Sequence, residues 1–262
     1  MKLKKLNFTA VLLLLFTIHS QAQLGFSHEI GVITGPVVFY SDFGQRNDME
    51  TNMGNVGYGI GIVHYMNFAY RADCNCYTRD TYFNDHFKVR SELSYHKTNF
   101  EHYGEWVDPS RTSTFADFLR AMKGSSSVVE LGAQLEYFPL SIRDYMANRY
   151  KIVPFVSFGF HWVNFKPEIY FDPPLSTIIT NPADYPDKYR DTAFLNQSDS
   201  SWAVLWSVGV RYKLSYSSDL MLDSRWVHYF SNWVDGLNPE VPENKANDWI
   251  YWLNIGYIYY IN

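Results

Sequence analysis

Cysteine, positive charge and long apolar runs are all scarce in this 262-residue sequence, and each shortage excludes a class of protein. Two cysteines are too few for a disulfide framework or a four-cysteine zinc site. The net charge of −5 provides no basic field for a nucleic acid, so we expect no nucleic-acid partner. Beyond the first segment no run of about 18 apolar residues occurs, which excludes a helical membrane span from the rest of the chain.

Aromatic residues, by contrast, are abundant: 8 Trp, 21 Tyr and 19 Phe make up 18 % of the chain. A chain this rich in aromatic side chains can bury enough apolar surface to offset the entropy lost on folding, so disorder is excluded. Aromatic residues also favour β-strands. The composition therefore predicts a compact, β-rich protein.

The first 22 residues have the organisation of a secretory signal peptide. Three lysines precede an apolar run over residues 10–18, and the small-residue ending Ser20-Gln21-Ala22 follows it. The alternative is a transmembrane anchor, but the apolar run is much shorter than the roughly 20 residues that a helical span needs. We expect cleavage after Ala22, which divides the chain into a signal peptide, 1–22, and one exported domain, 23–262.

Alternation with a period of two residues runs through most of the exported domain. Residues 202–216 show it best, because bulky Trp, Val, Tyr and Leu residues alternate there with small or charged ones. The same alternation recurs, less regularly, in other segments. We predict eight strands, over residues 28–40, 56–70, 87–98, 127–138, 152–165, 202–216, 219–230 and 249–261.

The two faces of these strands differ in a way that is typical of a membrane barrel. One face is bulky, apolar and rich in Trp and Tyr, whereas the other is small or ionic. In a transmembrane barrel, lipid contacts the bulky face and the lumen accepts the small and polar side chains. A soluble lipocalin-like barrel would place the bulky faces inside, where eight strands leave little room. The predicted fold class is an all-β, eight-stranded antiparallel transmembrane β-barrel of the outer membrane, surrounded by outer-membrane lipid, with a polar lumen that side chains fill.

The connections should alternate between the two ends of such a barrel, with the longer ones outside. We predict outer loops over about 41–54, 103–125, 166–201 and 231–248, and inner loops over about 72–85, 139–150 and 216–219. Within the second outer loop, Thr114 to Lys123 is expected to form a short helix, with Thr114 as its N-cap and Gly124 just past its end. The third outer loop is acidic but lacks the spacing of a calcium loop, so solvated acids are the preferred interpretation.

Charged residues of both signs fall on the inward face of neighbouring strands. Buried charges persist only when they are paired, so we expect a salt-bridge network that fills the lumen. An eight-stranded barrel has an interior that side chains can fill, and a diffusion pore is not expected. The predicted network contains Lys88, Arg90, Glu92, Glu130, Glu136, Arg211, Asp223 and Arg225.

One segment raises the question of catalysis. Residues 225–232 resemble the His-x-Ser-Asn motif of the PagL family, eight-stranded outer-membrane enzymes that deacylate lipid A. The resemblance implies that His228 activates Ser231, with Glu240 in the third role. Here, however, His228 and Ser231 are three residues apart, and such residues face opposite sides of a regular strand. We therefore predict no activated nucleophile and no enzyme, and keep a lipid A-modifying esterase as an alternative.

Glycines 57, 59 and 61 resemble part of a dinucleotide-binding fingerprint, but no helix follows them to bind a pyrophosphate. We expect them to face the lumen, and we expect no cofactor. His64, His96 and His161 lie on separate strands and are predicted to form no cluster.

Cys74 and Cys76 lie in the first inner loop, near Asp85 and His86. They could form a disulfide in an oxidising periplasm, or remain free thiols. A metal site would need two further ligands, for which Asp85 and His86 are the candidates. The sequence leaves these alternatives open, with the metal site the least favoured.

Four further stretches lie in different predicted strands and loops: His28-Glu29-Ile30-Gly31-Val32, Val153-Pro154-Phe155, Gly209-Val210-Arg211-Tyr212-Lys213-Leu214 and Ser231-Asn232-Trp233-Val234-Asp235-Gly236. They are similar to stretches of PorG, the small outer-membrane β-barrel of the type IX secretion system in Bacteroidota. The resemblance implies a non-enzymatic barrel that contacts periplasmic ring or translocon proteins, and it implies no catalytic residue. Loops 72–85 and 139–150 are then the expected docking surfaces. A surface adhesion or binding barrel that uses the acidic outer loop is a further alternative.

Overall fold

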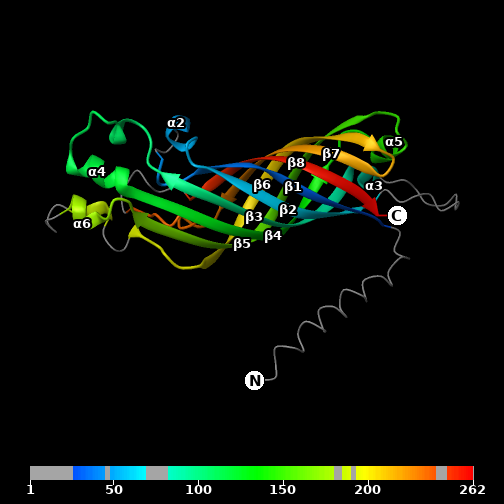
Figure 1. The fold of residues 1–262 in the computed structure, drawn as a ribbon. Coiled ribbons are helices and arrows are strands. Elements are labelled where there is room, and N and C mark those ends of the chain that lie inside the picture. The colour runs from blue at the N-terminus through cyan, green and yellow to red at the C-terminus, as the bar shows by residue number, and fades with distance from the viewer. Residues whose placement is uncertain are drawn as a thin grey trace, which may run out of the picture.

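Eight strands form one closed antiparallel barrel in the computed structural model, in which each strand pairs with its sequence neighbours and β1 pairs with β8 (Figure 1). The structure describes residues 26–44, 48–68, 82–179, 185–189, 193–239 and 247–261. The predicted fold class is confirmed, while the predicted signal peptide, 1–22, lies outside the described residues. The strands are β1 (Ser27–Tyr40), β2 (Val56–Asn67), β3 (Phe87–Glu101), β4 (Met122–Tyr137), β5 (Ile152–Phe171), β6 (Asp199–Ser215), β7 (Ser218–Tyr229) and β8 (Trp249–Ile261).

Strands β4 and β5 are longer than predicted. They pair as far as Met122 and Phe171, which shortens the outer loops on either side. The alternation is hard to see there because the outward side chains of β4, Lys123, Ser125 and Ser127, are polar. The extra length therefore projects beyond the apolar part of the wall.

The helix predicted in the second outer loop is present, but its ends differ from the prediction. It is α4 (Thr114–Ala121), and Ser113, not Thr114, is its N-cap. The Ser113 hydroxyl accepts the Ala116 N–H at 3.2 Å. The helix passes directly into β4, so Gly124 lies inside a strand and does not end the helix.

Short helices lie at both ends of the barrel (Figure 1). One end, here called the outer end, carries α2 (Met49–Asn52), η2 (Glu105–Val107), α4, α6 (Leu175–Ile178) and η4 (Asp187–Tyr189). The opposite, inner end carries α3 (Tyr82–His86), α5 (Ile142–Met146) and the last residues of β8. The names follow from loop length, because the longer loops of outer-membrane barrels lie outside the cell. No helix in the described ranges is long and apolar enough to cross a membrane.

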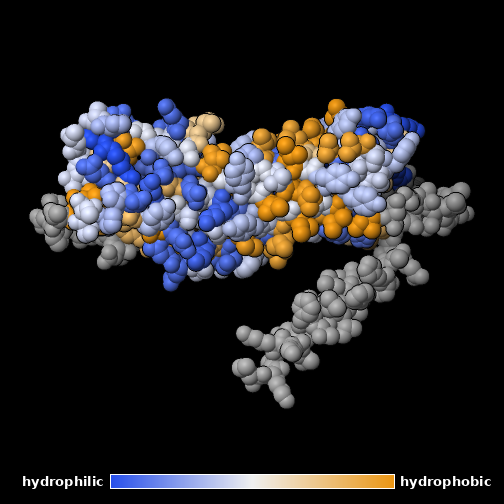
Figure 2. Space-filling view, viewed as in Figure 1, coloured by the Kyte–Doolittle hydropathy of each residue, from blue (hydrophilic) through white to orange (hydrophobic). Residues whose placement is uncertain are grey.

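The outward face of the wall is apolar over the half nearer the inner end (Figure 2). Large side chains there are half exposed: Ile60 at 58 %, Leu131 and Phe160 at 54 %, and Val208 at 54 %. A soluble protein does not present a continuous apolar wall of this kind to water. The half nearer the outer end is largely hydrophilic (Figure 2), so the barrel crosses the membrane with its inner half and projects from it with its outer half.

Small residues on the inward face make room for large ones. A Cβ on Gly59 would lie 2.3 Å from the ring of Trp252, which is fully buried in the lumen. The Gly57, Gly59 and Gly61 positions all face inward, as expected from the sequence, and Gly59 lets the bulky indole pass close to the β2 backbone.

Candidate functional site

A network of buried charges fills the lumen nearer the inner end. Arg211 of β6 donates to Glu29 of β1 at 2.6 Å and to Glu136 of β4 at 3.1 Å. Lys88 of β3 reaches the other oxygen of Glu29 at 2.5 Å. The Arg211 guanidinium also lies 4.1 Å from the ring centroid of Tyr65, so charges and aromatic faces share this layer.

A second layer lies one step further along the lumen. Arg225 donates to Glu92 at 2.7 Å and to Asp223 at 2.9 Å, and Arg90 contacts the same two acids at 2.8 and 3.2 Å. All four side chains are fully buried. Two guanidinium groups and two carboxylates therefore form a closed ring of ion pairs between β3 and β7, and these buried side chains occupy this layer of the lumen.

The structure places all eight residues of the predicted network inside the barrel. The prediction omitted Glu29 and Asp219, although both have the inward parity of their strands. It also omitted Tyr260, which accepts from Lys213 at 2.7 Å and donates to Asp219 at 2.5 Å. Tyr260 lies in a mostly apolar strand, so the sequence did not indicate that its hydroxyl would hydrogen-bond to charged groups in the lumen.

Two of the histidines that were expected to form no cluster meet around one carboxylate. Glu130 lies 2.9 Å from His161 Nδ1 and 3.4 Å from His96 Nε2, and it accepts the Tyr229 hydroxyl at 2.7 Å. The expectation was wrong because closure of the barrel brings β3, β4, β5 and β7 together across the lumen. The strands carry six buried carboxylates against five buried Lys and Arg side chains, so Glu130 has two imidazoles and a hydroxyl, and no Lys or Arg, as its neighbours among the described residues.

His64, the third histidine, also has a histidine neighbour. Its Nε2 lies 3.1 Å from Nδ1 of His28, on the outward face of β1 and β2. This pair is separate from the lumen network, since both rings project from the other side of the wall.

At the outer end, the segment 231–239 folds back into the mouth of the barrel. Val234, Asp235 and Leu237 are fully buried, and Ser126 of β4 donates to the Val234 carbonyl at 2.5 Å. A neighbouring part of the third outer loop is hydrogen-bonded to this segment, because the Leu195 N–H donates to the Gly236 carbonyl at 2.8 Å. Gly236 has φ of +87°, a conformation that favours glycine at this turn.

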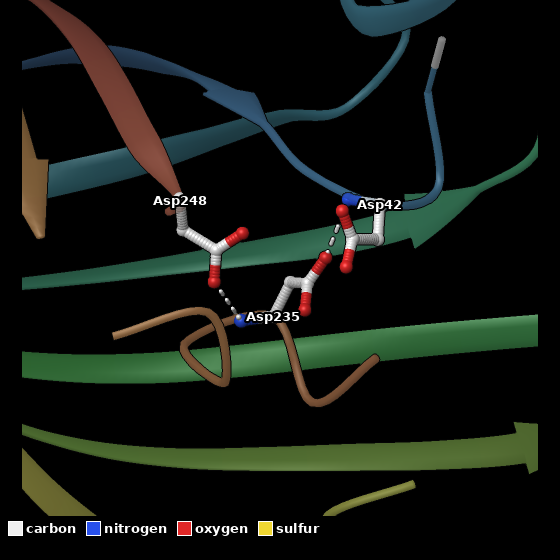
Figure 3. A group of neighbouring side chains, drawn as sticks. All are labelled: Asp42, Asp235 and Asp248. Atoms are coloured by element: carbon white, nitrogen blue, oxygen red, sulfur yellow. Dashed lines mark hydrogen bonds between the residues drawn. The ribbon is translucent and has the colours of Figure 1, made fainter. Parts of the chain in front are cut away.

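Three aspartates from distant parts of the chain converge on this segment (Figure 3). Asp235 accepts the backbone N–H of Asp42 at 2.7 Å, and Asp248 accepts those of Val234 at 2.8 Å and Asp235 at 3.2 Å. Ligand atoms of the three carboxylates lie within 4.8 Å of one another, close enough to hold one hard cation such as Ca²⁺. The carboxylates of Asp235 and Asp248 thus tie the segment to the starts of the first outer loop and of β8.

Burial favours the protonated form of Asp235 and Asp248. It raises the pKa of Asp235 to about 7, against the opposing effect of backbone N–H donors. It raises the pKa of Asp248 well above its usual range, and repulsion from Asp235 and Asp42 adds to the rise. The cluster therefore takes up protons more readily than isolated carboxylates do.

At the inner end, α5 closes the mouth. Ile142 and Tyr145 are buried, and the Tyr145 ring lies 4.9 Å from the Lys213 ammonium. Ser141 caps the helix by accepting the Asp144 N–H at 3.1 Å. Both ends of the lumen are therefore covered by the chain itself.

The residues of the esterase alternative do not meet in the described part of the chain. His228 lies on the outward face of β7 and its ring is 6.4 Å from that of Phe230, centroid to centroid. The Ser231 hydroxyl accepts the Trp233 N–H at 3.2 Å. No hydrogen bond joins His228 to Ser231 among the described contacts, and Glu240 lies outside the described residues.

The cysteine hypotheses concern a segment that is not described, since Cys74 and Cys76 lie between residues 68 and 82. The two other candidate ligands have structural roles. Asp85 accepts the Arg143 N–H at 3.0 Å, and His86 Nδ1 lies 2.6 Å from the Phe138 carbonyl oxygen. Both contacts join α3 to the β4–β5 connection.

Comparison with protein-family models and with curated proteins finds no match to the sequence. Among solved structures, a major outer membrane protein from Thermus thermophilus matches with a TM-score of 0.46 and 14 % identity, over 90 % of this chain and 99 % of that one. Ail, the attachment invasion locus protein of Yersinia pestis, solved with the heparin analogue sucrose octasulfate, matches with a TM-score of 0.41 and 10 % identity, over 91 % and 100 % of the two chains. Neisserial surface protein A matches with a TM-score of 0.41 and 12 % identity, over 90 % and 96 %.

Proposed function

We propose that this protein is a non-enzymatic outer-membrane barrel that serves as a structural or docking component of envelope machinery, and specifically of type IX protein secretion. The observation that carries the proposal is that buried, paired side chains occupy the lumen, with segment 231–239 and α5 buried at its two ends. A barrel whose lumen is occupied by its own side chains offers partners its wall and its two ends. The sequence resemblance to PorG suggests the secretion system in which it works.

The inner end has the features of a docking surface. Helices α3 and α5 are joined there by the Asp85–Arg143 contact and by the Phe138 N–H, which donates to the His86 carbonyl at 2.7 Å. Residues 82–85, the described part of the first predicted docking loop, therefore lie in one surface with the second, 139–150. Large apolar side chains remain exposed on it: Tyr82 at 62 %, Phe83 at 45 % and Leu140 at 42 %.

Affinity purification from the native outer membrane in mild detergent tests the proposal. We expect periplasmic ring or translocon proteins of type IX secretion to co-purify with the tagged protein. The double variant Phe83→Asp/Leu140→Asp should lose them, while Trp106→Asp, a matched change at an exposed site of the outer end, should retain them. Heat-dependent mobility on gels would verify that each barrel is folded. Two results would contradict docking: a folded barrel that purifies without partners, or partners that co-purify equally well with the Phe83→Asp/Leu140→Asp variant.

Adhesion is a second candidate because β3 to β6 carry their polar outward residues beyond the apolar wall and support α4 and α6. Deleting residues 174–184 tests it without touching Ala193 and Leu195, which hold the buried segment 231–239. Loss of binding to a host or neighbouring cell surface would favour adhesion, and unchanged binding would exclude this loop.

A further inference from the structure

His28 and His64 form a close pair on the outward face of the barrel. Nδ1 of His28 and Nε2 of His64 are 3.1 Å apart, and the rings stack with centroids 5.2 Å apart and planes 19° from parallel. The antiparallel register places His28 opposite Met66 and His64 opposite Ile30, so the two histidines are diagonal neighbours on adjacent strands. Strand pairing therefore fixes their separation.

The spacing of the two nitrogens suits shared ligation of one metal ion. Bonds of about 2.05 Å from a tetrahedral metal to two imidazole nitrogens place those nitrogens roughly 3.3 Å apart. The observed 3.1 Å needs only a small side-chain adjustment and no movement of the backbone. We propose that His28 and His64 form a two-histidine site for a divalent transition-metal ion of the copper, nickel and zinc class.

The surroundings are consistent with a transition metal rather than a hard cation. Imidazole suits copper, nickel and zinc, whereas calcium and magnesium require oxygen ligands. Glu29, the nearest carboxylate in sequence, points into the lumen and is paired with Lys88 and Arg211. Met66 projects from the same face as His28, so its thioether is the nearest candidate for a third ligand. Water would complete the coordination.

Access to the pair is from the inner end. His28 is the second residue of β1 and pairs with Ile261, the last residue of β8, so it lies at the rim of the wall. The His28 ring is exposed and the His64 ring is partly exposed. An ion can therefore reach both nitrogens from the periplasmic surface. The site lies at the same end of the barrel as the docking surface, but metal binding by the purified barrel tests it independently of the proposed function.

Copper binding to the purified, refolded barrel tests the site, with Cu²⁺ alone as the probe. Cys74→Ser/Cys76→Ser should be the background, because thiolates bind copper themselves. We expect one tight Cu²⁺ equivalent whose electron paramagnetic resonance spectrum shows two equatorial nitrogens. His28→Ala and His64→Ala should each weaken binding about tenfold or more and reduce the nitrogen count, while His228→Ala, which changes another outward histidine, on β7, should have no effect.

The double variant distinguishes a shared site from two independent ones. In a shared site either single change removes the chelate, so His28→Ala/His64→Ala should bind little more weakly than each single variant. Independent histidines would instead give additive losses. Additive losses, a one-nitrogen spectrum, or equal binding by the parent and single variants would overturn the proposal and leave a hydrogen-bonded histidine pair. Heat-dependent gel mobility would verify folding of every variant.

Discussion

Arg211 is held in the lumen by two carboxylates and an aromatic ring, and none of its surface is exposed. Removing a buried charge from water is costly, and the cost is recovered only when geometry and hydrogen bonding are good. Its partners, Glu29 and Glu136, are equally buried and come from β1 and β4. The side chain therefore joins three strands that are not all neighbours in the sheet.

Replacing Arg211 with methionine should destabilise the barrel strongly. The change leaves part of the negative charge of Glu29 and Glu136 unpaired in the lumen, which costs about 3–5 kcal/mol. Urea unfolding in lipid vesicles would measure the loss. Lys97→Met, at an exposed site of β3, is the matched control and should change the free energy of unfolding by less than about 1 kcal/mol. Equal stability of the Arg211 variant and the parent would show that the network contributes little.

The segment 231–239 is the outer-end element that two buried carboxylates anchor. Its two carboxylate anchors, Asp235 and Asp248, accept backbone N–H groups from four residues, and Figure 3 shows them facing one another with Asp42. Since burial raises the pKa of Asp235 to about 7, its folded-state pKa exceeds the ordinary value of 3.8. The protonated carboxyl thus contributes to holding the segment in place.

Raising the pH should loosen this segment. The contribution of Asp235 is fully present below pH 4, declines as pH rises, by about 1.4 kcal/mol for each unit, and is lost once the pH passes about 7. Amide hydrogen exchange at Val234 and Leu237, expressed as protection factors between pH 4 and 8, would measure it. Asp235→Asn should reduce the dependence to the part that Asp248 contributes, whereas Asp108→Asn, an exposed acid of another outer loop, should preserve it. An unchanged slope in Asp235→Asn would assign the effect to another group.

The strands were predictable from sequence because alternation directly encodes which face meets lipid. All eight were expected close to their observed bounds, and errors arose where the outward residues turn polar, at the start of β4 and the end of β5. Contacts across the lumen were less predictable. Glu130 joins His96 and His161 only because the barrel closes. Asp248 meets Asp235 only because a loop folds back into the mouth of the barrel. Neither event leaves a periodic pattern in the sequence.

At the scale of the whole molecule, the wall has an apolar part that contacts lipid and a polar part that contacts water. Outward residues of β4 illustrate the change, because Leu131 lies among apolar neighbours whereas Ser127 lies between Lys97 and Lys166 in the strand register. The apolar part includes Leu93 and Trp162, which flank Leu131. The boundary between lipid and water therefore crosses β4 between positions 131 and 127.

Arginine placed at these two positions should have very different effects. Leu131→Arg puts a charge into lipid and should cost about 2–4 kcal/mol, whereas Ser127→Arg lies at or above the interface and should cost about 0–1 kcal/mol. Both changes are on the same strand and the same face, so the environment of the new side chain is the main difference between them. The free energy of unfolding in phospholipid vesicles would measure each cost. Only contact with lipid makes an outward arginine costly here. Equal costs at the two positions would therefore place the membrane boundary nearer the outer end. A larger cost at Ser127 would mean that the outer half of the wall, and not the inner half, contacts lipid.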